Sequence, residues 1–238
     1  MKIKGRNAVL EAIKSGATVD KLLVQKGLFD GHSQRVIDAA KQTGIKPFFY
    51  DKSVLDSEGG AGHQGFVAVV TDYKYYQLED LIFGADKNAL ILILDGIEDP
   101  HNLGSVLRVA ECAGAAGVII PRHKSASVTE TVIKVSAGAA AHVRVAKVVN
   151  IAQSIEQLKK EGFFVYAAEL GGDDVYKTDL SGRTAIVIGG EDKGVGTRIK
   201  SVCDKVVTIP LKGSVNSLNA SVAAGIVVFE KMRQEKIS

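Results

Sequence analysis

The sequence predicts an α/β protein in two parts: a small N-terminal α/β domain, followed by a larger domain built on a parallel sheet. Three observations predict this arrangement. From residue 89 onward, short apolar runs alternate with amphipathic helical segments, as in proteins whose helices cover both faces of a parallel sheet. Residues 89–95 are almost continuously apolar, which is typical of a strand buried on both faces. Residues 73–88 break the alternation, so we expect domains at 1–72 and 89–238 with a linker at 73–88.

The composition limits the class of protein. The chain has 238 residues, of which 46% are hydrophobic, enough for one large or two modest cores. Its two cysteines are far apart and show no zinc-ligand spacing, so we expect a reducing cytoplasm and no metal. The N-terminus lacks a signal-peptide core, and no apolar run approaches the roughly 20 residues that span a membrane. A net charge of +3 is compatible with nucleic acid but does not establish that partner.

The N-terminal domain is expected to mix short helices and strands. Apolar spacing predicts helices at 6–14 and 33–42, strands at 21–24, 47–50 and 66–70, and a glycine-rich loop at 55–63. The candidates for phosphate contacts are four basic residues, for which a solvated basic face is an equally good interpretation: Lys2, Lys4, Arg6 and Lys14. His63 and Gln64 could contact bases, although a simple turn is the more common role of such a loop.

The expected linker carries three tyrosines, Tyr73, Tyr75 and Tyr76. Aromatic side chains of this kind can stack on nucleic-acid bases. Packing between the domains is the favoured interpretation here, because charged residues surround the tyrosines without a helical or strand period.

The larger domain is predicted to alternate strands and helices to its end. The strands are expected at 89–95, 117–120, 143–145, 163–168, 185–188 and 206–209, and the helices at 103–115, 129–137, 151–161 and 220–228. Ligands of parallel sheets bind where the strands end at their carboxyl edge. Polar loops occupy that position after Leu94, Ile188 and Ile209, so we expect a site there.

The first loop combines Pro100 with two polar candidates, Asn102 and Arg108. We expect Asn102 or Ser105 to cap the next helix, with Asn102 just outside it and Arg108 facing the same cavity. A guanidinium there suits a phosphate because it presents a planar fork of donors. The alternative is a solvated arginine on the helix surface.

The second and third loops differ in character. Residues 189–196, GGEDKGVG, match neither a P-loop nor GxGxxG, which disfavours a nucleotide-dependent dehydrogenase, but they place Glu191 at a strand end. The third loop concentrates five polar residues before a nearly uncharged helix: Ser214, Asn216, Ser217, Asn219 and Ser221. Such a loop could hold a small polar ligand, or could simply cap the helix through Ser217 or Asn219.

Taken together, these segments resemble the SpoU (TrmH-type) branch of the SPOUT RNA methyltransferases. Three of them occur in the order of that family: LDGIEDPHNLGSVLRVAECAGAAGVII, IVIGGEDKGVG and VTIPLKGSVNSLNASVAAGIVVFE. The N-terminal GRNAVLEAIKSG and GGAGHQGFVAVV are similar to the RNA-binding module, itself like small ribosomal proteins, that is often fused to this domain. Small departures are Asp192 and Lys193, where glycine is common, and Ala220 in place of a frequent valine.

The resemblance implies a deep trefoil knot in the parallel sheet, a homodimer, and S-adenosylmethionine as cofactor. Residues whose main chain would meet the cofactor are Gly189, Ile209 and Leu218, and the matching polar site residues are Asn102, Arg108, Glu191, Ser217 and Asn219. The implied reaction is methylation of the 2′-hydroxyl of a guanosine in large-subunit (23S) ribosomal RNA. A transfer RNA, another ribosomal nucleotide linked to antibiotic resistance, or a catalytically silent RNA-binding assembly factor are the alternatives.

The implied chemistry sets tasks for these residues. A sulfonium is already a good leaving group, so alignment and proton removal remain. The family proposal makes Arg108 the base, but a guanidinium holds its proton tightly. The alternative is that Arg108 clamps the phosphate and the hydroxyl while water or Glu191 takes the proton.

Overall fold

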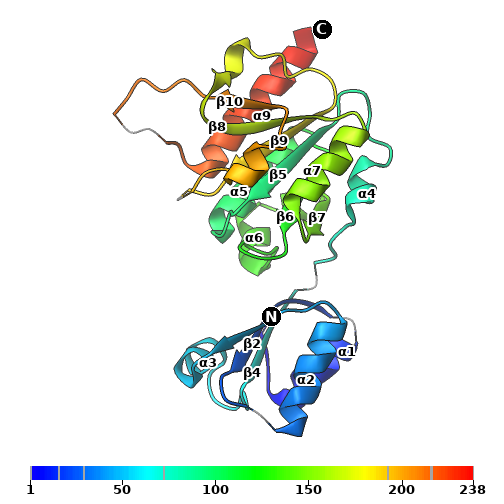
Figure 1. The fold of residues 1–238 in the computed structure, drawn as a ribbon, viewed down its shortest axis with the longest axis vertical. Helices are drawn as coiled ribbons and strands as arrows, with labels where there is room; N and C mark the ends of the chain where they lie inside the picture. Colours follow the sequence, from blue (N-terminus) through cyan, green and yellow to red (C-terminus); the bar gives the residue numbers. More distant parts are fainter. Residues whose placement is uncertain are drawn as a thin grey trace. The chain divides into compact units, whose positions relative to one another are not determined.

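The chain forms two compact units, Met1–Lys74 and Tyr75–Ser238 (Figure 1). The structure is a computed structural model that describes residues 2–15, 17–28, 30–71, 73–191, 193–214 and 217–237. No helix in these ranges is long and apolar enough to cross a membrane.

The first unit is a four-stranded sheet with helices on both faces. The strands β1 (Lys2–Lys4), β4 (Phe66–Thr71), β2 (Thr18–Gln25) and β3 (Pro47–Tyr50) lie side by side in that order. Only the β2–β3 pair is parallel. Helices α1 (Arg6–Lys14) and α2 (Gly31–Gln42) bury Val9, Ile13 and Val36 in the core on one face.

The other face is covered by α3 (Lys52–Gly59), which lies largely in the segment that we expected to be a glycine-rich loop. The expectation was wrong there because Leu55 is fully buried against Leu23 and Val67, and this burial stabilises a short helix. The glycine-rich loop therefore begins only at Gly60, where φ is 65° and a left-handed backbone ends the helix.

The second unit is built on a six-stranded sheet in which every pairing is parallel. Its strands, in spatial order, are β10 (Lys205–Thr208), β8 (Phe164–Asp174), β9 (Thr184–Gly189), β5 (Leu90–Asp95), β6 (Gly117–Pro121) and β7 (Val145–Val148). The predicted parallel sheet is confirmed. The trefoil knot stays a prediction.

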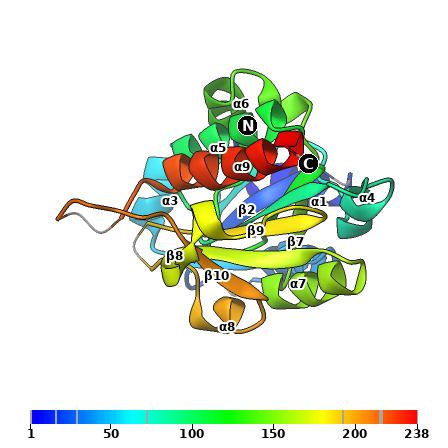
Figure 2. The same cartoon turned by 90° about the horizontal axis from the view of Figure 1, so that it is seen from above.

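Helices cover both faces of this sheet (Figure 2). On one side lie α5 (Pro100–Cys112) and α9 (Ala220–Ile237), and on the other α7 (Ile151–Lys160) and the short α8 (Thr197–Lys200). Helix α6 (Glu130–Val135) packs on α5, and a Cβ at Gly104 would collide with Val135. Gly104 therefore allows these two helices to approach closely.

Residues 75–88, which we expected to form most of a linker, lie in the second unit. The amide of Tyr76 donates to the carbonyl oxygen of Val145 (2.9 Å), and the hydroxyl of Tyr75 accepts from the amide of Val128 (2.8 Å). Helix α4 (Leu78–Ile82) follows and buries Leu78 and Leu81 in the core. These two leucines supply the apolar contacts that the sequence pattern did not reveal.

One buried cation anchors the end of α9 to the sheet. The Lys231 side chain is 1% exposed, and its ammonium donates to the carbonyl oxygens of Asn88 (2.9 Å) and Gly182 (3.2 Å) and pairs with Glu235. Burial lowers the pKa of Lys231 to about 8. Its hydrogen bonds therefore compensate for a costly desolvation.

Replacing Lys231 by methionine should lower the free energy of unfolding by about 2–4 kcal/mol, because Glu235 and two carbonyl oxygens lose their common donor. Urea denaturation followed by circular dichroism measures the change. The control is Lys177→Met, since Lys177 is 83% exposed and should matter little. Equal stability of the two variants would contradict this account.

Candidate functional site at the carboxyl edge of the sheet

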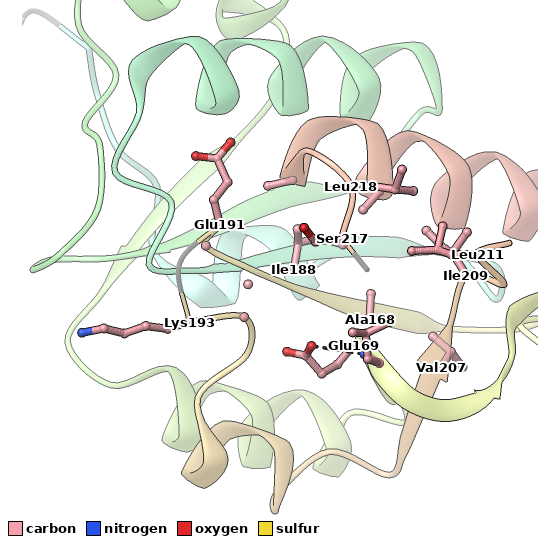
Figure 3. A pocket seen from close by; sticks show the side chains of 16 residues that line it. Ala168, Glu169, Ile188, Glu191, Lys193, Val207, Ile209, Leu211, Ser217 and Leu218 are labelled. Carbon is pink, nitrogen blue, oxygen red and sulfur yellow. Dashed lines mark hydrogen bonds between the residues drawn. The ribbon is translucent and has the colours of Figure 1, made fainter. Parts of the chain in front are cut away.

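A cavity of about 340 Å³ opens where β9 and β10 end, beside residues 168–170 in the middle of β8. Figure 3 shows apolar side chains, among them Ile209, Leu211 and Leu218, on one side of this cavity and Glu169 across from them. Four residues that the sequence singled out line it: Gly189, Ile209, Ser217 and Leu218. Glu191 lines it as well, with its carboxylate directed away from Ile209 and Leu211 (Figure 3).

The wall formed by residues 189–196 depends on close backbone contacts. A Cβ at Gly189 would overlap the backbone of Gly194 and Val195, and one at Gly190 would overlap the carbonyl oxygen of Gly96. The amide of Gly194 donates to the carbonyl oxygen of Gly190 (2.9 Å), which closes the turn. These glycines bring main-chain groups up to the cavity.

Glu169 is a site residue that the sequence analysis missed. It follows the apolar part of β8, lines the cavity and accepts a hydrogen bond from the amide of Val195 through Oε2 (2.7 Å). Glu169 on β8 thus holds in place the loop that follows the neighbouring strand β9 and contains Gly189, Gly190 and Gly194, which we call the glycine loop. The only signal was a charged residue directly after the predicted strand at 163–168.

Three polar side chains from three separate segments of the chain meet beside the cavity: the first turn of α5, residue 191 after β9, and the residue before α9. Asn102 donates through Nδ2 to Oε1 of Glu191 (2.6 Å). Asn219 donates through Nδ2 to the same oxygen (3.0 Å) and to Oδ1 of Asn102 (2.9 Å). We call these residues the Asn–Glu–Asn cluster. The structure therefore brings together three of the five polar residues that the sequence predicted for the site.

Asn219 also caps α9. Its Oδ1 accepts from the amide of Ser221 (2.9 Å), and its carbonyl oxygen accepts from the amide of Ala223 (2.9 Å). The helix cap that the sequence suggested for Asn219 is therefore present, and contact with the cofactor stays a prediction. Asn216 and Asp192 lie outside the described residues.

The start of α5 differs from expectation. Asp99 caps the helix by accepting from the amide of His101 (2.9 Å), and Pro100 is the first helical residue. Asn102 is therefore inside the helix rather than before it, and neither Asn102 nor Ser105 is the cap. The prediction failed because Asp99 is an equally good capping residue and a proline suits the first helical position.

Arg108 does not join the cluster. Six residues of an α-helix turn the side chain by roughly 600°, which leaves Arg108 about 120° around the axis from Asn102. Asn102 is buried, whereas Arg108 is exposed and lines neither the cavity above nor the second cavity described below. In these two cavities Arg108 does not join Asn102, and a role for Arg108 in the site stays a prediction.

A second cavity, of about 400 Å³, lies beside the first at the ends of β5 and β6. The two cavities share Gly190, Glu191, Lys193 and Gly194, so the glycine loop forms a common wall. The second cavity is richer in charged residues, with Asp95, Glu98, Asp99, His123 and Lys124 in its lining. Among the described residues, no group of three or more His, Cys, Asp and Glu side chains could hold a metal ion.

Comparison with known proteins identifies the family. The model of the SpoU rRNA Methylase family matches residues 89–229. YacO of Bacillus subtilis (strain 168), which bears a provisional name as a TrmH family tRNA/rRNA methyltransferase, is 40% identical over 234 residues, 97% of this chain and 94% of YacO. The chain belongs to the SpoU (TrmH-type) family of RNA 2′-O-ribose methyltransferases.

Further matches cover both units of this SpoU-family chain. A second family model, for RNA 2′-O ribose methyltransferase substrate binding, matches residues 2–76. The fold resembles that of AviRb from Streptomyces viridochromogenes, solved in complex with the cofactor AdoMet, with a TM-score of 0.64, 23% identity, and coverage of 100% of this chain and 91% of AviRb. An RNA 2′-O ribose methyltransferase of known structure gives a TM-score of 0.58 at 25% identity, covering 99% of this chain and 89% of that one.

Two substitutions at Asn219 should separate its two contacts. Asn219→Ala removes the cap and the amide donor, and should lower the free energy of unfolding by about 1–2 kcal/mol. Asn219→Ser keeps a capping oxygen but loses the donor to Glu191, and should recover most of that stability. Urea denaturation of both variants measures this, and equal destabilisation would show that the cap is not the stabilising contact.

Proposed function

We propose that this protein transfers a methyl group from S-adenosylmethionine to the 2′-oxygen of a guanosine in large-subunit ribosomal RNA in the cytoplasm. The observation that carries the proposal is the Asn–Glu–Asn cluster, whose Glu191 lines the first cavity. It draws on the same three loops that carry the family resemblance.

The first cavity suits S-adenosylmethionine. Its volume of about 340 Å³ falls in the range of small-molecule sites, and such sites combine apolar walls with a few polar groups. Ile209, Leu211 and Leu218 offer an apolar surface to the adenine ring, while the glycines at 189, 190 and 194 expose main-chain groups to polar atoms of the cofactor. The knotted path of the chain around this cavity belongs to the same proposal.

When bound, the cofactor supplies an electrophilic methyl group on a sulfonium. The chain's task is to align the ribose hydroxyl and to take its proton. Glu191 is the candidate for both tasks, which is supported by its hydrogen bonds: both amide donors of the cluster bind Oε1, and Oε2 makes no hydrogen bond to any described residue. Oε2 is thus a carboxylate oxygen free to accept from the hydroxyl. Ser217, on the wall of the first cavity, is a further candidate to orient the ribose.

Arg108 is assigned to the RNA backbone. Its side chain is exposed and forms no hydrogen bond or ion pair with the described part of the chain, so its fork of donors is available to a phosphate. This role needs no deprotonation of the guanidinium.

The N-terminal unit is proposed to hold the RNA. Of its four basic candidates, three form exposed or half-exposed ion pairs: Lys2 with Glu58, Arg6 with Asp30 and Lys14 with Glu11. Pairs of this kind contribute only about 0–1 kcal/mol, so a phosphate can replace the carboxylate. Lys4 has no such partner among the described residues.

His63 is not proposed to contact RNA. Its side chain is 4% exposed, its Nδ1 accepts from the amide of Gly65 (2.9 Å) and its Nε2 contacts Asp56 (2.9 Å). It orders the turn, in which Gln64 adopts a φ of 48° and accepts from the amide of Arg6 (3.3 Å). This supports the simple-turn interpretation of the loop.

A homodimer through α9 and α5 is part of the proposal. Two large apolar side chains lie exposed seven residues apart on α9, Val222 at 50% and Phe229 at 47%. Residues at that spacing share one helix face. Arg108 lies on α5, the helix that packs against α9 near Gly225 and Val109, so an interface here would bring the arginine close to a second copy.

Phe229→Glu should convert the proposed dimer into a monomer, because a charge would be buried in the interface. Sedimentation velocity measures the mass. The control is Val149→Glu, at another exposed apolar residue that is 72% exposed. A wild-type monomer, or a dimeric Phe229→Glu variant, would refute this interface.

The reaction is tested by incubating the protein with methyl-labelled S-adenosylmethionine and unmodified ribosomal and transfer RNA, followed by alkaline hydrolysis. A methylated 2′-oxygen cannot attack the adjacent phosphate, so the label should survive in a dinucleotide from ribosomal RNA that begins with guanosine. Label from transfer RNA alone would keep the chemistry and replace the substrate. Tight binding of S-adenosylmethionine without label in either RNA would indicate that the substrate is an assembly-stage particle. No binding of the cofactor would indicate a catalytically silent RNA-binding protein.

Arg108→Lys should lower the methylation rate by about 10–100-fold, since one or two charge-assisted hydrogen bonds of about 1.5–3 kcal/mol in total are lost. Cofactor affinity, measured by calorimetry, should not change. The control is Arg198→Lys on the exposed surface of α8. A near-normal rate would rule out any role that requires the planar fork.

A further inference from the structure

We propose that the second cavity receives the base of the target nucleotide and that Glu98 recognises it as guanine through its Watson–Crick edge. The inference rests on the proposed function. It adds the residue that selects the base, and it starts from a cavity that the cofactor does not need.

The position of the second cavity suits a methyl acceptor. Methyl transfer requires donor and acceptor atoms about 3–3.5 Å apart, so the acceptor must lie next to the cofactor. The second cavity shares Gly190, Glu191, Lys193 and Gly194 with the first, and Asn102 lines it as well. Glu191 of the Asn–Glu–Asn cluster thus lies at the boundary between the two cavities. A volume of about 400 Å³ is in the range of sites for small molecules of nucleoside size.

Of the carboxylates that line this cavity, three already have partners within the protein. Asp95 accepts from the amide of Gly196 (2.8 Å), Asp99 caps α5, and Glu191 accepts from two amides. Glu98 is exposed and, as far as the chain is described, makes no hydrogen bond or ion pair. Of these four carboxylates, Glu98 is the one with both oxygens left for a ligand.

A lone carboxylate selects among the bases by chemistry. Guanine presents N1–H and N2–H side by side, and the two oxygens of a carboxylate accept both. Adenine, cytosine and uracil each place a ring-nitrogen or carbonyl acceptor beside their donor, which repels the second oxygen. Enzymes that act on a nucleotide outside its helix recognise the same edge of the base.

The cations of the lining suit the rest of a nucleotide. Lys124 and Lys193 are exposed, and the Lys193 side chain extends away from Val207 and Ile209 of the first cavity (Figure 3). A phosphate next to the target ribose would meet these charges. Guanine would thus bind the negatively charged Glu98, and a phosphate would bind the positively charged Lys124 and Lys193.

The test compares guanosine 5′-monophosphate with inosine 5′-monophosphate, which lacks only the 2-amino group. Each is titrated into the full-length protein saturated with S-adenosylhomocysteine, and binding is followed by NMR. The wild type should bind the guanosine nucleotide about tenfold more tightly, and Glu98→Gln should remove this preference. The control Glu156→Gln, on the exposed face of α7, should keep it.

Three results would overturn the proposal. They are equal binding of the two nucleotides by the wild type, an unchanged preference in Glu98→Gln, and no detectable binding of guanosine 5′-monophosphate by the wild type. Thermal unfolding of Glu98→Gln checks that the variant is folded. This binding measurement does not depend on methyl transfer. A preference for guanosine through Glu98 in a protein that labels neither free RNA nor assembly-stage ribosomal particles would refute the proposed function alone. Label in another nucleoside would refute the pocket alone.

Discussion

The site depends on one carboxylate oxygen that three loops share. Oε1 of Glu191 accepts from Asn102, 89 residues earlier in the chain, and from Asn219, 28 residues later. Each loop follows a strand of the parallel sheet, so the sheet brings the loops to one edge, and the shared oxygen then fixes their side chains relative to one another. Loss of any one partner would leave a polar group of the remaining two without its hydrogen bond.

The glycine loop makes this arrangement possible because it separates two cavities while occupying little space. Gly189 and Gly190 lie so close to neighbouring backbone that no side chain fits, and Glu169 holds the loop from β8. Consequently the loop contributes to both cavities, of which the second has more charged residues in its lining. A group-transfer enzyme needs this combination, since its two substrates must meet across a short distance without sharing one pocket.

From the sequence, the fold could be predicted more accurately than the positions and contacts of individual side chains. Continuous apolar runs located the strands of the parallel sheet, because a strand that is buried on both faces consists almost entirely of apolar residues. The start of α5 was placed wrongly, since Asp99 and Asn102 are comparable caps and only the structure shows which one accepts from the helix. Glu169 was missed because a charge after a strand is a weak signal, and because its contact with Val195 spans 26 residues and follows no period. The strand ends predicted that the segments carrying Asn102, Glu191 and Asn219 meet at one edge, and the resemblance selected these residues from among the polar ones there.

The chemistry of the cluster explains why two of its members are amides. Asn102 donates to Glu191 through Nδ2 and accepts from Asn219 through Oδ1, so it must offer a donor and an acceptor at once. Asn219 donates twice through Nδ2 while its Oδ1 caps α9, so the same requirement holds there. An aspartate at either position would place a second negative charge against Glu191, and a lysine would offer no acceptor. Asparagine and glutamine meet both demands, and the shorter asparagine also fits a helix cap.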